Sequence, residues 1–204
     1  MTGSFAALAP VIPTPHIEYG QLSPMLLVFG AAIVGVLVEA FAPRSLRRSL
    51  HLALTLGSLA GAFVLTIVIA TSSTLFAGGS AGHIAAMGAV AVDRPTLFIQ
   101  GTILVLAFIS VLLIAESSHD VSAFAAQAAA VPGSPEEREG LLAGISHTEV
   151  YPLTLFAIGG MLLFPASNDL LTMFVALEVL SLPLYLLSGL ARRRRLLSQE
   201  AAMK

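Results

Sequence analysis

Five runs of apolar residues, each 17 to 21 residues long, constrain this chain more than any other feature of its sequence. They cover Leu22–Phe41, Leu50–Ala70, Pro95–Ala115, Val150–Ala166 and Leu170–Leu190. A helix that crosses a bilayer core needs about 20 consecutive apolar residues. Because lipid offers no hydrogen-bond partner to an open backbone, such runs are expected to be α-helices. The sequence therefore predicts an all-α membrane protein, a polytopic bundle of transmembrane helices with five spans.

The composition excludes a soluble domain. Hydrophobic residues make up 56% of the 204 residues and charged residues only 11%, whereas soluble domains carry about 25% charged residues. The formal net charge of −2 gives no support for a nucleic-acid partner. The chain has no cysteine and therefore can hold no disulfide, iron–sulfur cluster or thiolate zinc site. Any redox cofactor that serves this protein is expected in other chains.

The arginines predict the orientation of the chain in the membrane. Cytoplasmic loops are enriched in Lys and Arg. Arg44, Arg47 and Arg48 follow the first run, and residues 192–195 are four arginines after the fifth. We therefore expect a multi-pass membrane protein with its N-terminus outside, in which Arg94 is the one arginine of an outer loop.

The segments between the runs divide the chain. We expect an extracytoplasmic segment (1–21), three helices with an outer loop at 71–94 (22–116), a cytoplasmic loop (117–148), and two helices with the start of a sixth (149–204). Alternating residues around Ile84–Val92 predict a small hairpin, and residues 165–169 leave room only for a tight antiparallel turn. A new helical pattern starts at Leu196, so we expect the chain to be part of a longer protein.

Glu178 is the one charged residue in the middle of a run. At 1.5 Å per residue it lies about 12 Å from one end of the fifth run and 18 Å from the other. Ionisable residues at this depth usually mark a path for ions or protons. The alternative is a neutral glutamic acid that hydrogen-bonds to a neighbouring helix.

Polar residues continue from Glu178 along one helix face. Steps of three and four residues reach Ser181, Tyr185 and Ser188, in the direction of the arginines. The stripe is polar on this side of the carboxyl only, which predicts a half-channel for water or protons that opens to the cytoplasm. Serines at such positions also serve as packing contacts between membrane helices.

Lys204 is the second candidate for proton translocation. It lies about 12 Å into the expected sixth helix, deeper than an ordinary anchor, although a lysine there can also extend its side chain to the interface. A buried glutamate and a buried lysine set each other's protonation, because desolvation favours the neutral form of each and their attraction favours the charged form.

The remaining polar features predict structure rather than chemistry. We expect Glu39 to form an interfacial salt bridge with Arg44, Arg47 or Arg48, and Gln100 to hydrogen-bond across helices. The five histidines have no ligand spacing, so no metal site is predicted. Two glycines four residues apart, Gly57 and Gly61, are expected to allow a close helix contact.

Residues 78–82 match the G-x-S-x-G pattern of hydrolases. That pattern requires a strand before it and a helix after it, and here it lies in a loop between membrane spans. We therefore expect no hydrolase, and no catalytic residue of that kind.

Three stretches resemble a known family. They run from Glu149 to Leu171, from Leu177 to Gly189 (LEVLSLPLYLLSG) and from Glu200 to Lys204 (EAAMK). This pattern resembles the antiporter-like membrane subunits of bacterial respiratory complex I, the NADH-quinone oxidoreductase, and among these subunits it is most similar to subunit N. Residues 1–146 agree with the family in the number and arrangement of spans.

The resemblance implies that Glu178 is the mid-membrane glutamate of the family and Lys204 a lysine of its central charged axis. It further implies about fourteen helices, with more lysines on later ones. The expected function is proton translocation coupled to quinone reduction, in the bacterial cell (inner) membrane. The expected partners are membrane lipid and the other membrane and hydrophilic subunits of the complex. FMN, Fe–S clusters and quinone are expected in those partner subunits. The alternatives are a subunit of a cation/proton antiporter complex and a passive scaffold of the pump.

Overall fold

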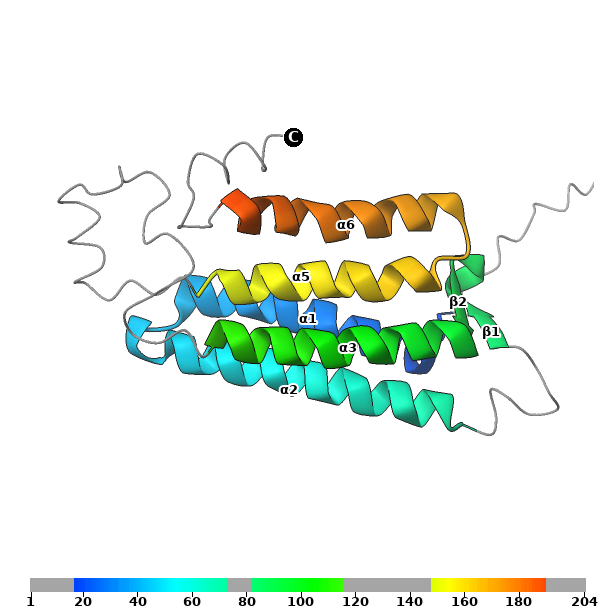
Figure 1. The fold of residues 1–204 in the computed structure, drawn as a ribbon, viewed down its shortest axis with the longest axis horizontal. Coiled ribbons are helices and arrows are strands. Elements are labelled where there is room, and N and C mark those ends of the chain that lie inside the picture. The colour runs from blue at the N-terminus through cyan, green and yellow to red at the C-terminus, as the bar shows by residue number, and fades with distance from the viewer. Residues whose placement is uncertain (1–16, 73–81, 116–147, 190–204) are drawn as a thin grey trace, which may run out of the picture.

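The computed structural model describes residues 17–72, 82–115 and 148–189. In these residues, five α-helices run along one axis, each antiparallel to the one before it (Figure 1): α1 (Tyr19–Phe41), α2 (Arg44–Ala70), α3 (Arg94–Ala115), α5 (Val150–Leu163) and α6 (Leu170–Gly189). All but α5 are long and apolar enough to cross a membrane. A 3-10 turn, η3 (Phe164–Ala166), extends α5 over the fourth apolar run. The predicted all-α membrane bundle is confirmed.

Helices α1, α2 and α3 begin before the apolar runs that predicted them. The largest difference is at α2, which begins at Arg44 rather than at Leu50. Pro43 precedes it in an extended conformation, and proline is well suited to a helix start because it has no N–H to leave unpaired. An apolar run therefore marks the part of a helix that lipid or protein covers, and the arginine-rich first turns of α2 lie outside that part.

Helix α5 occupies the centre of the bundle. It packs against α1, α2, α3 and α6, and nine of its 14 residues are buried, Leu155 and Leu162 among the most deeply. Gln100 of α3 donates a hydrogen bond from Nε2 to the carbonyl oxygen of Leu162, at 2.9 Å. This bond confirms the predicted polar contact between helices.

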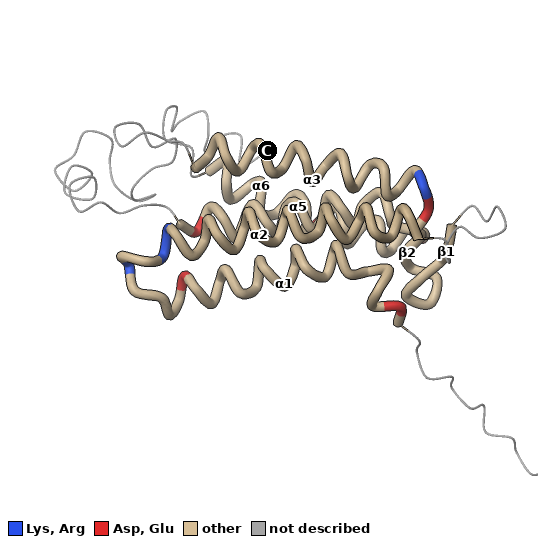
Figure 2. Tube along the Cα trace, turned by 90° about the horizontal axis from the view of Figure 1, so that it is seen from below, with Lys and Arg blue, Asp and Glu red and all other residues tan. Residues whose placement is uncertain are grey.

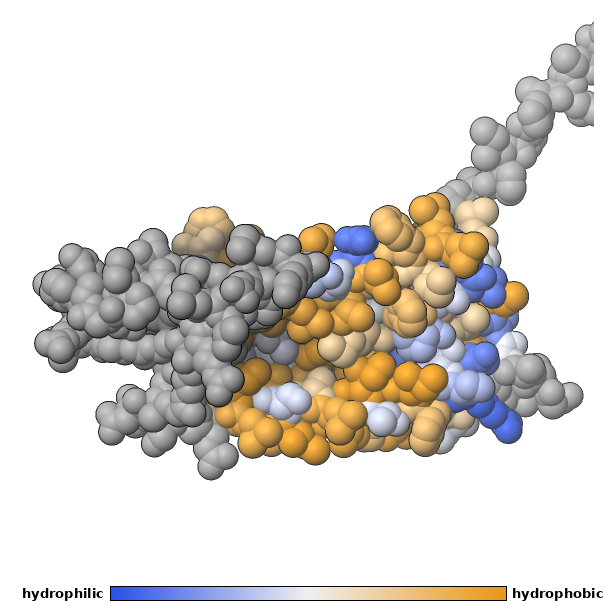
Figure 3. Space-filling view, turned by 45° about the horizontal axis from the view of Figure 1, so that its top comes forward, coloured by the Kyte–Doolittle hydropathy of each residue, from blue (hydrophilic) through white to orange (hydrophobic). Residues whose placement is uncertain are grey.

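The outer surface of the bundle is apolar along its length and charged at its ends. Figure 3 shows hydrophobic side chains over the middle of the described surface, and Figure 2 shows acidic and basic residues gathered toward the two ends. We call the end that carries Arg44, Arg47 and Arg48 the arginine end. Such a distribution suits a protein whose sides face lipid and whose ends face water.

The opposite end, which we call the hairpin end, is closed by two short strands. The strands β1 (Gly82–Ala85) and β2 (Val90–Asp93) pair antiparallel, with Ile84 opposite Ala91. They are joined through the 3-10 turn η2 (Ala86–Gly88). Asn168, in the short turn between α5 and α6, donates from Nδ2 to the carbonyl oxygen of Gly88 at 2.7 Å. Both the predicted hairpin and the predicted tight turn are confirmed.

The two glycines of the sequence pattern behave differently, and only Gly61 lies close to another helix. A Cβ built on Gly57 would meet nothing within 4 Å, and one on Gly61 would meet only the end of the Leu27 side chain, at 3.0 Å. The expectation for Gly57 is therefore wrong. The closest approach of two backbones is instead at Gly160 of α5, because α5 is the helix that others surround.

Candidate functional site

Glu178 lies near the middle of α6, on the face turned away from α5. A Cβ built on Gly160 would lie 2.5 Å from the backbone nitrogen of Leu180 and 3.0 Å from the carbonyl oxygen of Ala176, so these two residues mark the α5-facing side of α6. Each is two residues from Glu178, and two residues correspond to about 200° of helical rotation. Glu178 is therefore on the opposite side of the helix.

This face of α6 is only partly covered by the described residues. Glu178 is half-buried, and Phe174, Leu177 and Leu182 around it are exposed. Within the described ranges its carboxyl group has no hydrogen-bond or ion-pair partner. A charged side chain held in lipid at this depth costs at least about 2.5–3.5 kcal/mol. An ionised Glu178 is therefore costly at this position unless it has a polar partner, and a neutral carboxyl group is less so.

The predicted polar stripe lies on the same face, with its serine hydroxyls already bonded to their own helix. Ser181 Oγ donates to the carbonyl oxygen of Glu178 at 3.4 Å, and Ser188 Oγ donates to that of Tyr185 at 2.8 Å. Tyr185 is half exposed. Such bonds leave each hydroxyl oxygen able to accept a further hydrogen bond. A role for this stripe in holding water stays a prediction, and Lys204 lies outside the described residues.

A second carboxyl group, that of Glu39, lies at the centre of a polar junction at the arginine end. Arg47 Nη1 lies 2.7 Å from Glu39 Oε1, in a salt bridge. Glu39 Oε2 accepts a hydrogen bond from Thr148 Oγ1 at 2.6 Å and lies 3.0 Å from His51 Nε2. The predicted salt bridge of Glu39 is thus confirmed with Arg47. Arg48 instead donates to the carbonyl oxygen of Ala115, at 3.1 Å.

His51 is the buried member of this junction. Only 1% of its side chain is exposed, against 26% for Glu39. Its ring stacks on that of Tyr151 of α5, with the centroids 6.0 Å apart and the planes 15° from parallel. Gly35 of α1 leaves room for both helices, since a Cβ there would lie 3.1 Å from Pro152 Cβ and 3.8 Å from His51 Cε1. The junction therefore joins α1, α2 and the start of α5.

The sequence gives no sign of a role for His51, because the groups around it are distant along the chain. Glu39 is 12 residues away, on another helix, and Tyr151 is 100 residues away. One signal of its position was present, however. Helices α1 and α2 are antiparallel and turn at Ala42 and Pro43, so residues at similar distances from the turn lie side by side. This places Glu39 beside Arg47, and His51 lies one helical turn further along α2, on the same face as Arg47.

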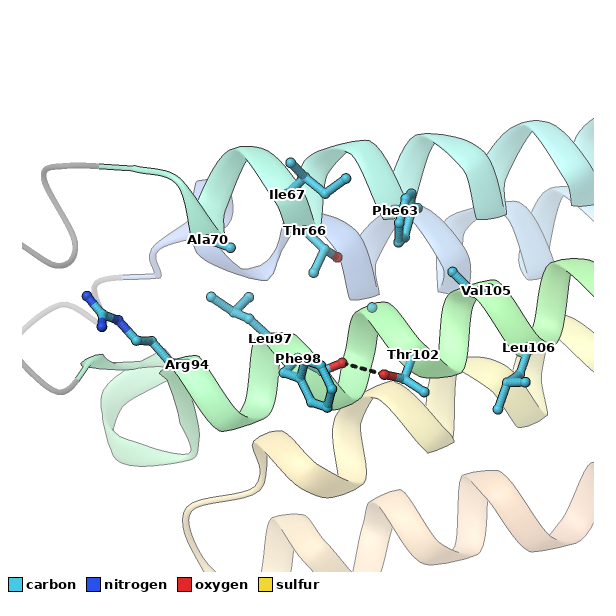
Figure 4. Close-up of a pocket in the computed structure, with 11 residues that line it drawn as sticks. Phe63, Thr66, Ile67, Ala70, Arg94, Leu97, Phe98, Thr102, Val105 and Leu106 are labelled. Atoms are coloured by element: carbon cyan, nitrogen blue, oxygen red, sulfur yellow. Dashed lines mark hydrogen bonds between the residues drawn. The ribbon is translucent and has the colours of Figure 1, made fainter.

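A groove between α2 and α3 is remote from both carboxyl groups. Its volume is about 530 Å³, and its lining is apolar apart from Arg94 at one end and two threonines (Figure 4). The hydroxyl of Thr102 donates back to the carbonyl oxygen of Phe98, at 2.9 Å. With no carboxyl group or imidazole in its lining, this groove offers no group for proton transfer.

These features define a class: a polytopic α-helical membrane protein with a carboxyl group on an outer helix face. No protein-family model matches the chain. Curated relatives do, and the three reported next are each named NADH-quinone oxidoreductase subunit N. The chain is 58% identical to that of Rhodococcus opacus over 97% of its length, 57% identical to that of Acidothermus cellulolyticus over 98%, and 52% identical to that of Mycobacterium tuberculosis over 95%.

The chain therefore belongs to the family of NADH-quinone oxidoreductase subunit N, and the resemblance predicted from its sequence is confirmed. It spans 39%, 37% and 39% of the length of these three relatives.

Proposed function

We propose that this chain is part of a proton-translocating membrane subunit of NADH-quinone oxidoreductase, the respiratory complex I, with Glu178 and Lys204 as its buried charges. The shared name of the relatives supports membership of that enzyme. The observation that carries the proton-translocating role is the position of Glu178, near mid-helix on the face of α6 opposite to α5, with no partner among the described residues.

The proposed mechanism is a change in the charge of buried groups. Quinone reduction, with FMN and Fe–S clusters, takes place in partner subunits, and the energy reaches this chain as a change in the field around Glu178. When Glu178 is charged it favours a protonated lysine nearby, and when its field is cancelled the lysine releases its proton. Water held by Ser181, Tyr185 and Ser188 connects these groups to the arginine end.

The arginine end is proposed to face the cytoplasm. Arg44, Arg47 and Arg48 lie together there, whereas Arg94 lies at the hairpin end, and basic residues stay inside during insertion. The hairpin and the N-terminus are then outside. A reporter fused near Gly82 is expected to be accessible from outside the cell, and a reporter fused after residue 195 only from inside. The reverse labelling would overturn this orientation.

The test of the proposed function is Glu178→Gln in the assembled enzyme. The substitution keeps the shape and removes the charge, so protons pumped per NADH oxidised should fall strongly. Electron transfer from NADH to an artificial acceptor should be unchanged, since it does not require the membrane subunits. Glu178→Asp is the matched control, because it keeps the charge and should retain part of the pumping. Pumping at the wild-type rate in an assembled Gln variant would refute the proposal.

Purification decides between complex I and an antiporter complex, which would use the same pair of charges. Co-purification of FMN and Fe–S proteins with the full-length protein is expected for complex I, and their absence from an intact complex would favour the antiporter.

A further inference from the structure

We propose that Glu39, His51 and Thr55 form a second proton-exchange site, in which a proton that enters through Glu39 is held on His51 and a water molecule beside the Thr55 hydroxyl accepts a hydrogen bond from the protonated ring. The proposal stands apart from the role of Glu178, because it concerns other helices and is defined by the binding of a proton and a water molecule. It rests on the hydrogen bonds of the polar junction and on one buried hydroxyl group.

The junction leads from the surface to the interior. The side chains of Glu39 and Arg47 are 26% and 23% exposed, whereas that of His51 is 1% exposed. The 3.0 Å contact between Glu39 Oε2 and His51 Nε2 is therefore a hydrogen bond between a group that water reaches and a group that water outside the protein does not reach. Imidazole suits such a position, because it can accept a proton at one nitrogen and release one from the other.

The Thr55 hydroxyl is the second observation. Thr55 is fully buried on α2, one turn beyond His51, and its Oγ1 has no hydrogen-bond partner among the described residues. Four other threonines in or next to these helices donate to the carbonyl oxygen four residues earlier, at 2.7–2.9 Å: Thr66, Thr71, Thr102 and Thr154. Two others, Thr96 and Thr172, donate to different acceptors. Thr55 uses neither kind of partner, and a buried polar group without a protein partner commonly holds a water molecule.

The neighbours of Thr55 can complete the coordination of this water. His51, Thr55 and Ser58 are spaced by four and three residues, which places them on one face of α2, and all three are buried. Ser58 Oγ donates to the carbonyl oxygen of Thr55 at 3.0 Å, so its own oxygen can accept. Because Nε2 is the nitrogen that receives the proton from Glu39, the neutral His51 carries its own proton on Nδ1 and can donate a hydrogen bond to the water. A buried water typically makes two to four such bonds.

The charged and titratable groups around His51 come from three elements. Glu39 belongs to α1, Arg47 and Arg48 to α2, and Tyr151 to α5, with Arg48 beside the Tyr151 hydroxyl. The two guanidinium groups stay protonated. Glu39 and His51 are therefore the pair that can exchange a proton.

The proton balance closes within the pair. A proton from solvent forms an O–H bond on Glu39. That O–H bond breaks as an N–H bond forms at His51 Nε2, which leaves the Glu39 carboxylate and an imidazolium whose Nδ1–H donates to the water at Thr55. Release reverses these steps, so the proton returns to solvent through Glu39. Beyond Ser58 the buried face of α2 presents Leu59 and Ala62, so along this helix the site loads a proton and does not conduct it through the membrane.

The first experiment locates the water in the assembled, full-length enzyme. A density map at a resolution that reveals ordered water should show one within hydrogen-bond distance of Thr55 Oγ1. Thr55→Val, which has the same shape without the hydroxyl, should lose that water, and Thr55→Ser should keep it. A wild-type map without an ordered water at Thr55 Oγ1 would overturn the proposal.

The second experiment detects the proton. Infrared difference spectra of the enzyme with isotope-labelled histidine, recorded between about pH 5 and 8, the range in which imidazole commonly titrates, should contain one imidazole signal that is absent from His51→Gln and is accompanied by a carboxyl signal. Thr55→Val should alter this signal and Glu178→Gln should leave it intact, which separates a failure here from a failure of the proposed function. If His51→Gln does not assemble, the comparison of wild type with Thr55→Val decides. A spectrum without any pH-dependent change assigned to His51 would leave only a structural contact and refute the proposal.

Discussion

Glu39 and Glu178 are carboxyl groups of the same chain in opposite situations. Glu39 lies two residues from the end of α1, beside partners from α2 and from Thr148. Glu178 lies near the middle of α6 and has no partner among the described residues. A charge near a helix end can therefore be paired by other residues of the same chain. The charge at mid-helix instead lies on the side of α6 that is turned away from α5. We therefore expect the loss of Glu39 to lower stability, and the loss of Glu178 to reduce pumping with little effect on stability.

Helices α5 and α6 differ in the same way as these two carboxyl groups. Helix α5 is buried by its neighbours and holds the junction at its first residues, whereas only Ala176 and Pro183 of α6 are buried. Helices α5 and α6 approach each other closely at Gly160. This contact fixes the position of α6, and with it the position of Glu178, relative to α5.

The largest effect is expected from Gly160→Leu. A Cβ at this position would already lie 2.5 Å from the backbone of α6, and backbone cannot move aside as a side chain can. The added atoms should displace α6 and cost more than the ~1–3 kcal/mol typical of an overpacked core. The amount of assembled enzyme in membranes is the measurement. Gly57→Leu, at a position where a Cβ meets nothing within 4 Å, is the matched control. Normal assembly of the Gly160 variant would contradict the packing described.

The next largest effect is expected from Glu39→Ala. The substitution leaves Arg47, His51 and Thr148 without their shared acceptor, and unsatisfied groups of this kind cost about 1–3 kcal/mol where they are buried. The cost should lie toward the lower part of that range, because Glu39 and Arg47 are partly exposed and water can replace the lost bonds. The midpoint of thermal unfolding of the purified enzyme should fall. An unchanged midpoint would show that water satisfies the junction fully.

Glu178→Gln should have a smaller effect on the same thermal midpoint, and of the opposite sign if any. No described residue loses a hydrogen bond, and the neutral amide is less costly than a carboxylate within the membrane. This result would sharpen the contrast with Glu39, because the variant that loses pumping would be the one that keeps its stability. A large drop in the midpoint would instead reveal that Glu178 is a structural acid bound by a partner outside the described residues.

The smallest effect is expected at Asp169, before the first residue of α6. Hydrogen bonds from the side chain and backbone of Thr172 lower the pKa of the Asp169 carboxyl. Because the pKa in the folded state is below that in the unfolded state, the stabilisation is present above the unfolded pKa of about 3.9 and disappears as the pH falls through the folded one. Asp169→Asn should therefore reduce the acid sensitivity of the thermal midpoint slightly. An identical pH profile would show that this exposed contact contributes nothing.

The sequence alone determined the features that depend on local composition. Five apolar runs specified five helices, because a membrane helix satisfies its backbone within itself and needs no distant partner. Glu178 was identifiable as the mid-span charge for the same reason, and the hairpin and the tight turn followed from short segments between runs. Gln100 and the Glu39 salt bridge could be predicted as types of contact, because polar side chains in such surroundings require a partner.

Only the tertiary structure decided which groups meet. Gly57 and Gly61 carry the expected pattern, yet it is Gly160 whose added Cβ would meet the backbone of another helix, α6. Gly160 has this role because α5 lies at the centre, and that place results from the packing of all five helices. His51 meets both Glu39 and Tyr151 in the bundle, and no spacing along the chain associates His51 with Tyr151 of α5. The face of Glu178 was likewise fixed only by the contact of α5 with Ala176 and Leu180, because a helix alone has no inside and outside until another helix packs against it.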